Sequence, residues 1–349
     1  ERVLTTSRPN VVVVILESFA RTVMDADVGG LPVMPNMQRL KGEGIWFENF
    51  FANSFRTDRG EVAILSGFPA QTRMSIMKLP AKSRNLPSLA RSLSGAGYAT
   101  GFSYGGDLNF TDQASYMYAT GWQQLTWQKD LRFDTPPADW GYDDAVMCDW
   151  FADRVIALSG KGEPFLAGML TLSSHRPFDV PFSKFDDKEL NAFAFSDECV
   201  GRMVDKLKAS PAWDNLLLVL VADHGYPWPR SLSYNEPLRH RIPMIWLGGA
   251  VAAPRVVDTY ASQIDICATI LGQLGIDHSD FDYSKDIFAP TPPRKFAYYT
   301  FNDGFGVVDA SGEAVWDATG GRVVTETNPE LLDVGRTMLQ TTYVDIGRR

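Results

Sequence analysis

Long apolar runs are missing from this sequence of 349 residues. A helix that crosses a bilayer needs about 20 consecutive apolar residues, whereas the best candidate, residues 11–16, ends at Glu17. The first residues also lack the basic and apolar segments of a secretory signal peptide. Since the chain begins at Glu1 and not at Met, the missing anchor says little about the full gene product.

Basic residues and cysteines are also scarce. The 33 Lys and Arg residues are outnumbered by 42 Asp and Glu residues, and this acidic balance argues against nucleic-acid binding, which needs a concentrated positive surface. The cysteines, Cys148, Cys199 and Cys267, lie far apart without a CxxC pair, so we expect buried free thiols. With 45% hydrophobic residues, the composition is that of a globular protein and excludes disorder and fibrous repeats.

What the sequence does contain is an alternation of buried strands and helices. Residues 11–16 and 216–222 are continuous apolar runs, which are typical of strands buried on both faces of a parallel sheet. Weaker strand candidates are residues 99–104, 165–172 and 242–247. Helical patterns cover residues 35–42, 86–96, 143–159, 187–209 and 263–274. This alternation predicts an α/β fold with helices on both faces of a mostly parallel central sheet.

The pattern changes after the proline-rich residues 289–293. Short antiparallel strands joined by tight turns are predicted next, followed by a last helix over residues 329–343. The predicted strands are residues 296–300, 304–309 and 314–317. We therefore expect a large α/β catalytic domain over residues 1–290 and a small β/α subdomain over residues 291–349.

Both strong strands end in polar residues that a hydrophobic core would exclude. Glu17 follows the first strand, and Asp223-His224 follows the second. Ligand sites of open parallel sheets form at the carboxyl ends of the strands, and two carboxylates with an imidazole suit a divalent cation. Glu17 alone is better interpreted as a helix cap or an ion-paired carboxylate, and Asp223-His224 alone is as easily a polar turn. Together they favour a metal site.

A third segment, residues 53–61, precedes a predicted helix. Asp58 and Glu61 have the spacing of a capping pattern, and a hydroxyl just before a helix lies beside free backbone N–H groups that suit an anion. Thr57, if bound to a cation, would lose its proton more readily and become a nucleophile. Arg56 and Arg59 could neutralise a phosphoryl or sulfuryl group. Taken alone, the segment is a simple helix cap with two surface arginines.

Four motifs occur in a familiar order: an apolar strand followed by Leu-Glu-Ser at residues 10–18, Ser-Phe-Arg-Thr-Asp-Arg-Gly at 54–60, Ser-Ser-His-Arg-Pro-Phe at 173–178, and Ala-Asp-His-Gly at 222–225. They resemble the extracytoplasmic catalytic domain of the lipoteichoic acid synthase group, the phosphoglycerol transferases of the alkaline phosphatase/sulfatase superfamily. Further family-like stretches at residues 104–107, 241–244, 262–265 and 301–306 extend the resemblance over nearly the whole chain. The arginines around Thr57 make it closer to the Gram-negative branch.

The resemblance implies a site and a cofactor. One divalent ion, Mn²⁺ before Mg²⁺ or Zn²⁺, would be bound by four residues, with Thr57 also serving as the nucleophile. The four are Glu17, Thr57, Asp223 and His224. His175 matches the histidine that contacts the substrate phosphate, and we expect further substrate contacts from Arg59, Asp107 and Asn109.

The resemblance also implies a reaction and a place for it. Thr57 would attack a phospholipid such as phosphatidylglycerol, form a covalent phospho-threonine, and pass the phosphoglycerol group to a glycan or glycerol-phosphate acceptor. We expect a monomer at the periplasmic face of the inner membrane, held there by an N-terminal anchor that this chain lacks. No nucleic-acid partner is expected.

Other functions remain open at this point. A phosphodiesterase or phosphatase would use the same residues with water as the acceptor, and a phosphoethanolamine transferase would use the same threonine and metal, although its soluble domain is usually rich in disulfides. A sulfatase would need a Cys or Ser in place of Thr57. A non-catalytic relative that binds lipid head groups is an alternative of a different class.

Overall fold

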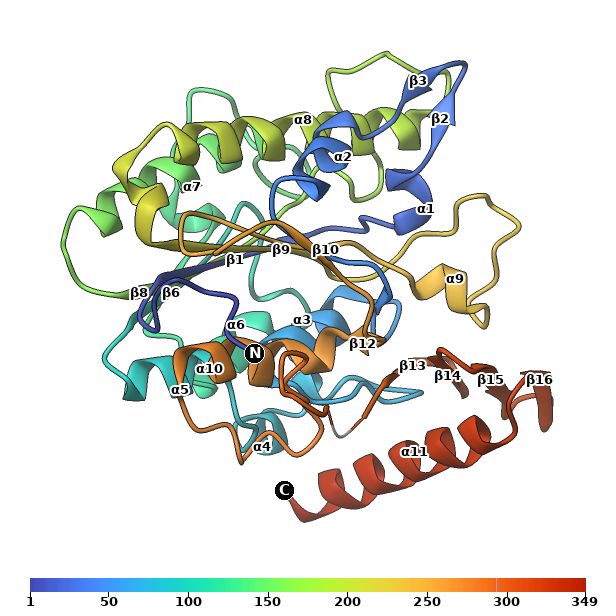
Figure 1. The fold of residues 1–349 in the computed structure, drawn as a ribbon. Coiled ribbons are helices and arrows are strands. Elements are labelled where there is room, and N and C mark those ends of the chain that lie inside the picture. The colour runs from blue at the N-terminus through green and yellow to red at the C-terminus, as the bar shows by residue number, and fades with distance from the viewer. Residues whose placement is uncertain (293) are drawn as a thin grey trace.

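A computed structural model describes residues 1–292 and 294–349. At its centre lies one sheet of eight strands (Figure 1). The strands are β1 (Asn10–Leu16), β4 (Ile45–Phe47), β6 (Ala99–Tyr104), β7 (Gln124–Thr126), β8 (Phe165–Leu170), β9 (Leu216–Ala222), β10 (Met244–Leu247) and β11 (Arg255–Val257). Their order across the sheet is β11-β4-β10-β9-β1-β8-β6-β7.

The two strongest strand predictions form the middle of this sheet. β1 pairs in parallel with β9 on one side and with β8 on the other, and β6 continues the parallel pairing outward from β8. β10 runs antiparallel to its neighbours β9 and β4. The prediction of a mostly parallel sheet is therefore confirmed, and the register that pairs Leu16 with Ala222 brings the carboxyl ends of β1 and β9 together.

Helices cover both faces of the sheet, which explains why every residue of β1 and β9 is buried (Figure 1). On one face lie α2 (Pro35–Lys41), α7 (Asp144–Ser159) and α8 (Lys188–Lys208). On the other lie α3 (Thr57–Ser66), α5 (Leu89–Gly95), α6 (Gln113–Ala119) and α10 (Ile266–Leu274). The cysteines are buried and free, as predicted. Among the residues that the structure describes, no helix has both the length and the apolar character needed to cross a bilayer.

Short elements complete this part of the chain, and the sequence analysis predicted none of them. They are α1 (Arg21–Met24), β2 (Asp27–Val28), β3 (Leu31–Pro32), β5 (Phe50–Phe51), α4 (Pro80–Ser83), α9 (Pro237–His240) and β12 (Ala261–Ser262). The sequence also gave no sign of β4, β7 and β11. Segments of two to four residues are too short for a hydrophobic period to stand out, so their strand or helix character depends on the neighbours they meet.

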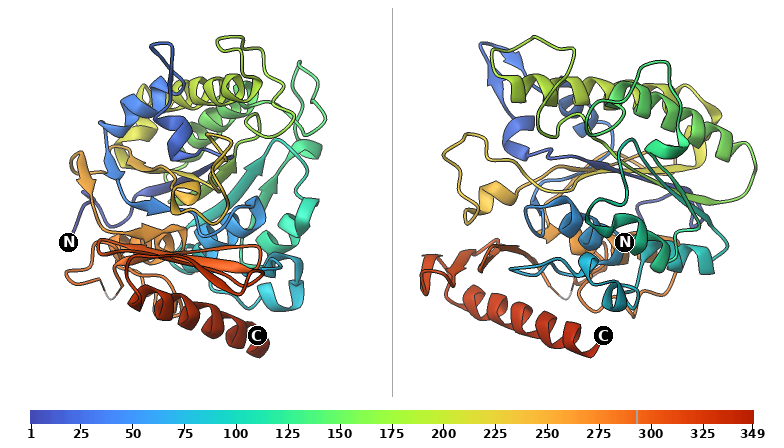
Figure 2. Two further views of the ribbon diagram at one scale, coloured as in Figure 1. Left: turned by 90° about the vertical axis from the view of Figure 1, so that its right-hand side faces the viewer. Right: turned by 180° about the vertical axis from the view of Figure 1, so that it is seen from behind.

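The C-terminal part forms a second, antiparallel sheet, seen with its helix at the bottom of both views in Figure 2. Its strands are β13 (Phe296–Phe301), β14 (Gly304–Asp309), β15 (Gly312–Asp317) and β16 (Arg322–Glu326), and the helix is α11 (Glu330–Arg348). β16 was not predicted, because it is an exposed edge strand without an apolar face. Residue 293 of the proline-rich segment lies outside the described residues, and the boundary between residues 290 and 291 stays a prediction.

The second sheet supports the segment that precedes α3. The Thr300 N–H donates to the Asn53 carbonyl oxygen at 2.9 Å, and Asn53 Nδ2 donates to the Tyr298 carbonyl oxygen at 2.7 Å. Ser54 Oγ donates to the carbonyl oxygen of Thr300 at 3.1 Å. The segment that leads into α3 is therefore held from outside the central sheet.

Gly60 sets how closely α3 approaches the end of β9. A Cβ atom at this position would lie 2.2 Å from the backbone oxygen of Asp223, a contact that neither backbone can relieve cheaply. Gly60→Ala should therefore lower the free energy of unfolding by about 1–3 kcal/mol, measured by chemical denaturation. Gly347→Ala is the control, because nothing lies within 4 Å of its added methyl group in α11. Equal stability of the two variants would contradict this packing argument.

Candidate active site

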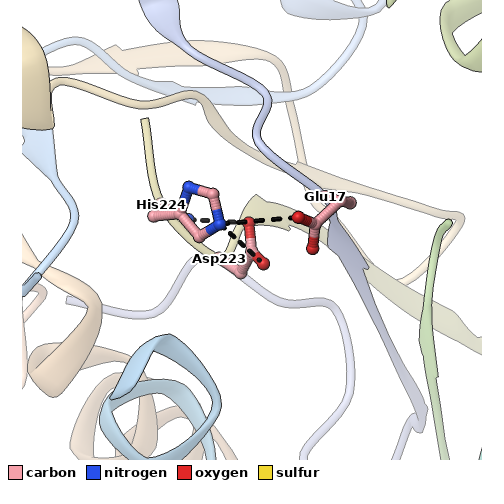
Figure 3. Close-up of side chains that lie close together, drawn as sticks. All are labelled: Glu17, Asp223 and His224. Atoms are coloured by element: carbon pink, nitrogen blue, oxygen red, sulfur yellow. Dashed lines mark hydrogen bonds and ion pairs between the residues drawn. The ribbon is translucent and has the colours of Figure 1, made fainter. Parts of the chain in front are cut away.

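The polar residues that follow β1 and β9 meet at one edge of the sheet. The Asp223 N–H donates to the Leu16 carbonyl oxygen at 3.3 Å, which continues the pairing of the two strands by one residue. Ser18 then turns the chain with a φ of 59°, and its N–H donates to Asp223 Oδ1 at 2.8 Å. Consequently the side chains of Glu17 and Asp223 point into the same small volume, together with His224 (Figure 3).

Thr57, the first residue of α3, joins this cluster. Its Oγ1 atom lies 2.7 Å from Asp223 Oδ2 and 3.1 Å from Glu17 Oε2. His224 Nε2 lies 3.4 Å from Asp223 Oδ2 and 3.5 Å from Glu17 Oε1. The structure thus brings together all four residues that the sequence analysis assigned to the cation, and their roles as ligands and nucleophile stay predictions.

Gln263 holds the segment before α3 against the end of β9. Its Nε2 atom donates to the carbonyl oxygens of Ala222 and Asp223 at 2.8 and 2.7 Å, and its Oε1 atom accepts from the Asn53 N–H at 2.9 Å. A single buried amide therefore fixes the distance between the carboxylate strand end and the threonine helix. Residues 262–265 stand out in the sequence as a family-like stretch, but no local pattern indicates this role of Gln263.

Electrostatics in the cluster is dominated by two buried carboxylates in contact. Burial raises the pKa of Asp223, and the charge of Glu17 raises it further. Burial also acts to raise the pKa of Glu17, but the hydrogen bond and charge of His224 outweigh it, so the net shift is downward. For His224, burial favours the neutral ring, yet the neighbouring Asp223 and Glu17 raise its pKa to about 9. Without a metal ion, protons on Asp223 and His224 therefore reduce the negative charge of the cluster.

The donor set fits a divalent cation. Two carboxylates and one imidazole offer ligand atoms that all lie within 4.8 Å of one another. Among the described residues, His224 is the only cationic group paired with Glu17 or Asp223. A cluster of buried carboxylates that is compensated only by a titrating histidine is well suited to exchange its protons for a metal ion.

A cavity of about 560 Å³ opens above the cluster. Glu17, Thr57 and His224 line it, and so do two of the predicted substrate contacts, His175 and Asp107. The His175 ring lies against Trp140, with 4.6 Å between ring centroids, and its Nδ1 atom is 2.7 Å from the Arg176 carbonyl oxygen.

The other two predicted substrate contacts do not line this cavity. Arg59 is 4% exposed, with Nη1 3.4 Å from Ser54 Oγ and its guanidinium 5.0 Å from the centre of the Phe55 ring. Asn109 is exposed, and its backbone N–H donates to Asp107 Oδ1 at 2.8 Å. Arg59 therefore contacts the base of the Thr57 loop, and Asn109 helps to orient Asp107.

Asp144 anchors the loop that carries His175. Its carboxylate accepts from the N–H groups of Leu172 and Ser173 at 2.7 and 3.1 Å and from Ser196 Oγ at 2.7 Å. The loop is tied to the cluster from its other side, where Ser174 Oγ donates to the Glu17 carbonyl oxygen at 2.6 Å. Burial raises the pKa of Asp144 to about 6 against the opposing effect of these hydrogen bonds. An Asp at the start of a helix resembles an ordinary cap, so the sequence held no signal for this role.

The Sulfatase family profile matches residues 9–276, which is well over half of the chain. The chain belongs to the sulfatase family. This confirms the superfamily to which the motifs around Glu17, Thr57 and Asp223 pointed.

Named relatives of this sulfatase-family chain include transferases. Phosphoglycerol transferase I of Xanthomonas campestris pv. campestris is 27% identical over 319 residues, which cover 82% of this chain and 43% of the relative. Lipoteichoic acid synthase 2 of Bacillus subtilis is 24% identical over 307 residues, with 78% of this chain and 46% of the relative covered. The chain thus spans less than half the length of these relatives.

Solved structures show the same fold over nearly the whole chain. A protein of the alkaline phosphatase superfamily from Vibrio parahaemolyticus superposes with a TM-score of 0.85 and 24% identity, covering 98% of this chain and 88% of that one. The lipoteichoic acid synthase LtaP from Listeria monocytogenes gives a TM-score of 0.83 at 20% identity, covering 98% and 93%.

His240 lies near the site but belongs to the protein interior. Its ring is fully buried and stacks on Tyr299, with 4.1 Å between the centroids, and Nε2 lies 2.6 Å from the Tyr234 carbonyl oxygen. Nδ1 makes no hydrogen bond with any residue that the structure describes. Burial, together with the charge of the adjacent Arg239, lowers the pKa of His240 to about 3. The ring is therefore neutral in the folded protein.

This neutral histidine should make stability depend on pH. The pKa of His240 is about 3 in the folded protein and about 6.5 in the unfolded chain. The neutral ring therefore contributes fully to the free energy of unfolding above pH 6.5, and this contribution declines as the pH falls toward 3. The expected slope is up to about 1.4 kcal/mol per pH unit. Between about pH 6.5 and 5, the wild type should lose about 2 kcal/mol more than His240→Gln, whose amide can still donate to Tyr234. If urea denaturation shows the same dependence of stability on pH for the wild type and His240→Gln, the assignment of a neutral buried His240 is wrong.

Proposed function

We propose that this chain is the catalytic domain of a metal-dependent phosphoglycerol transferase in which Thr57 is the nucleophile and Glu17, Thr57, Asp223 and His224 hold one divalent ion, with Mn²⁺ favoured. The observation that carries the proposal is the position of Thr57 Oγ1, within 3.1 Å of both buried carboxylates at the N-terminus of α3. The transferase names of the relatives support this reaction over sulfate-ester hydrolysis. Thr57 also stands where a sulfatase would need a Cys or Ser.

The surroundings of Thr57 suit an attack on phosphorus. Thr57 and Asp58, the first two residues of α3, line the cavity, so the positive end of the helix dipole lies beside the place where phosphate oxygens would carry negative charge. A divalent ion, when bound, lowers the pKa of a coordinated hydroxyl and screens the charge of the phosphate. The Nδ1 atom of His175 lies 2.7 Å from the Arg176 carbonyl oxygen, which leaves Nε2 for the substrate.

The proposed reaction has two displacements at phosphorus. In the first, Thr57 Oγ1 bonds to the phosphorus of a phospholipid such as phosphatidylglycerol, the bond to the diacylglycerol oxygen breaks, and that oxygen takes up the proton that Thr57 released. In the second, the oxygen of a glycan or glycerol-phosphate hydroxyl bonds to phosphorus, the bond between phosphorus and Thr57 Oγ1 breaks, and the proton of the acceptor hydroxyl returns to Oγ1. The covalent phospho-threonine explains how donor and acceptor can use one cavity in turn.

The donor and the relatives together suggest where the reaction occurs. We propose that the chain works at the outer face of a membrane, on the periplasmic side, where a lipid donor and a cell-envelope acceptor are both within reach. An N-terminal anchor on the full protein would keep the cavity close to that surface.

Thr57→Ala should abolish transfer, because it removes the hydroxyl that lies within 3.1 Å of both Glu17 and Asp223 and that would form the covalent ester. We expect a fall of about four to six orders of magnitude in turnover of phosphatidylglycerol, with the free energy of unfolding unchanged within about 1 kcal/mol. Mass spectrometry should detect a glycerophosphate adduct on Thr57 of the wild type and none on the variant. Thr57→Ser, the matched control, should keep measurable activity. Full activity of Thr57→Ala would refute the proposal, whereas diacylglycerol and free glycerophosphate without acceptor transfer would indicate a hydrolase.

Removal of the metal should reduce turnover as strongly as removal of the Thr57 hydroxyl. Chelation should stop turnover and added Mn²⁺ should restore it. Asp223→Asn, which keeps the size of the side chain but removes its charge, should weaken Mn²⁺ binding more than about tenfold in calorimetry. Asp139→Asn is the control, because Asp139 lines the same cavity outside the carboxylate cluster. Equal affinities of the two variants would exclude Asp223 as a ligand.

A further inference from the structure

Arg239 is a buried cation without a counter-ion. It lies in α9, on the connection from β9 to β10, and only 4% of its surface is exposed. Among the described residues, its Nε and Nη1 atoms have no hydrogen-bond partner, and no carboxylate there forms an ion pair with it. Leaving a desolvated charge unpaired is costly, so such a group calls for a ligand that compensates it.

The guanidinium faces the cavity above Thr57. Arg239 lines that cavity together with His224 and Gly225. A Cβ atom at Gly225 would lie 3.2 Å from Arg239 Nη1, so the guanidinium is beside the residue that directly follows the predicted metal ligand. Burial lowers the pKa of Arg239, but a guanidinium keeps its charge in proteins.

Aromatic rings fix the position of this charge. The Arg239 guanidinium carbon lies 5.0 Å from the centre of the Tyr234 ring, which in turn packs against Phe55 with 4.8 Å between centroids. Phe55 belongs to the segment that leads into Thr57. The arginine is therefore held relative to the nucleophile by a short chain of contacts, although α9 itself has only four residues.

We propose that Arg239 is a substrate-binding residue whose guanidinium donates a hydrogen bond to a non-bridging phosphate oxygen of the phosphoglycerol group, an assignment that rests on the proposed function. The cavity has other arginines, Arg56 and Arg176, but both are exposed and their charges are shared with water. A guanidinium shielded from water attracts a phosphate oxygen more strongly than an exposed one does. Arg239 thus favours an anionic group beside His224 and would take the charge-neutralising role that the sequence analysis expected of Arg59.

The test measures binding of glycerol 1-phosphate to the full chain with saturating Mn²⁺. Arg239→Met should weaken binding about 10- to 100-fold in calorimetry, since it removes the charged donor and keeps an apolar stem. Arg230→Met is the matched control: it carries the same charge change on the same connection, yet its side chain is 73% exposed and does not line the cavity. The control should bind within about twofold of the wild type.

A purely structural role of Arg239 would give a different result in this binding test. Loss of the Tyr234 contact alone would lower the melting temperature of Arg239→Met and leave the affinity of the folded protein unchanged, which would overturn the proposal. If Arg239→Met does not fold, Arg239→Lys decides. Its compact ammonium group cannot reproduce the guanidinium geometry, so binding should weaken at least about fivefold, and unchanged affinity would overturn the proposal.

The result of the Arg239 test can be distinguished from the result of the test of the proposed function. Glycerol 1-phosphate binding requires no transfer, so the effect of Arg239→Met can be read even if Thr57 proves not to be a nucleophile. Conversely, a wild type that transfers phosphoglycerol, beside an Arg239→Met variant with unchanged KM and kcat, would leave the proposed function standing and remove only the role of Arg239.

Discussion

Repulsion between two buried carboxylates is the constraint on which this site depends. Glu17 and Asp223 are forced together because they follow neighbouring parallel strands in the same register. The pair cannot remain doubly charged in a buried site without a compensating cation, and within the described chain only His224 offers one. The arrangement is unfavourable as a purely structural device and becomes understandable if the site exists to bind a metal ion.

The rest of the fold serves to hold a hydroxyl against that pair. Gln263 links the Asn53 backbone to the end of β9, Gly60 permits close contact between α3 and Asp223, and the second sheet supports Asn53 and Ser54 from outside. These contacts join segments that lie between 40 and 246 residues apart in sequence. Their common effect is to keep the first residue of α3 within hydrogen-bond distance of both carboxylates, so little reorganisation is needed before reaction.

Two kinds of charged group surround the reacting atoms. The carboxylates face the predicted metal position, while Arg239 and the first turn of α3 face the cavity, where a phosphate would lie. Because Arg239 and His240 are adjacent, the charge of the arginine helps to keep the histidine neutral. One cation is thus directed at the cavity and its neighbour is kept uncharged in the interior, which concentrates positive charge where an anionic substrate would bind.

The sequence by itself determined the central strands, the main flanking helices, and the meeting of Glu17 with Asp223 and His224. Continuous apolar runs mark buried strands, and parallel strands bring their carboxyl ends to one edge. Motif order added Thr57, which local pattern alone left as a helix cap. Only the tertiary structure decided the short edge strands, the withdrawal of Arg59 from the cavity, and the roles of Gln263, Asp144 and Arg239. The reason is physical. A buried amide, carboxylate or guanidinium acts through partners that are distant in sequence. The spacing of neighbouring residues therefore does not indicate which partners such a side chain meets or whether it faces a cavity.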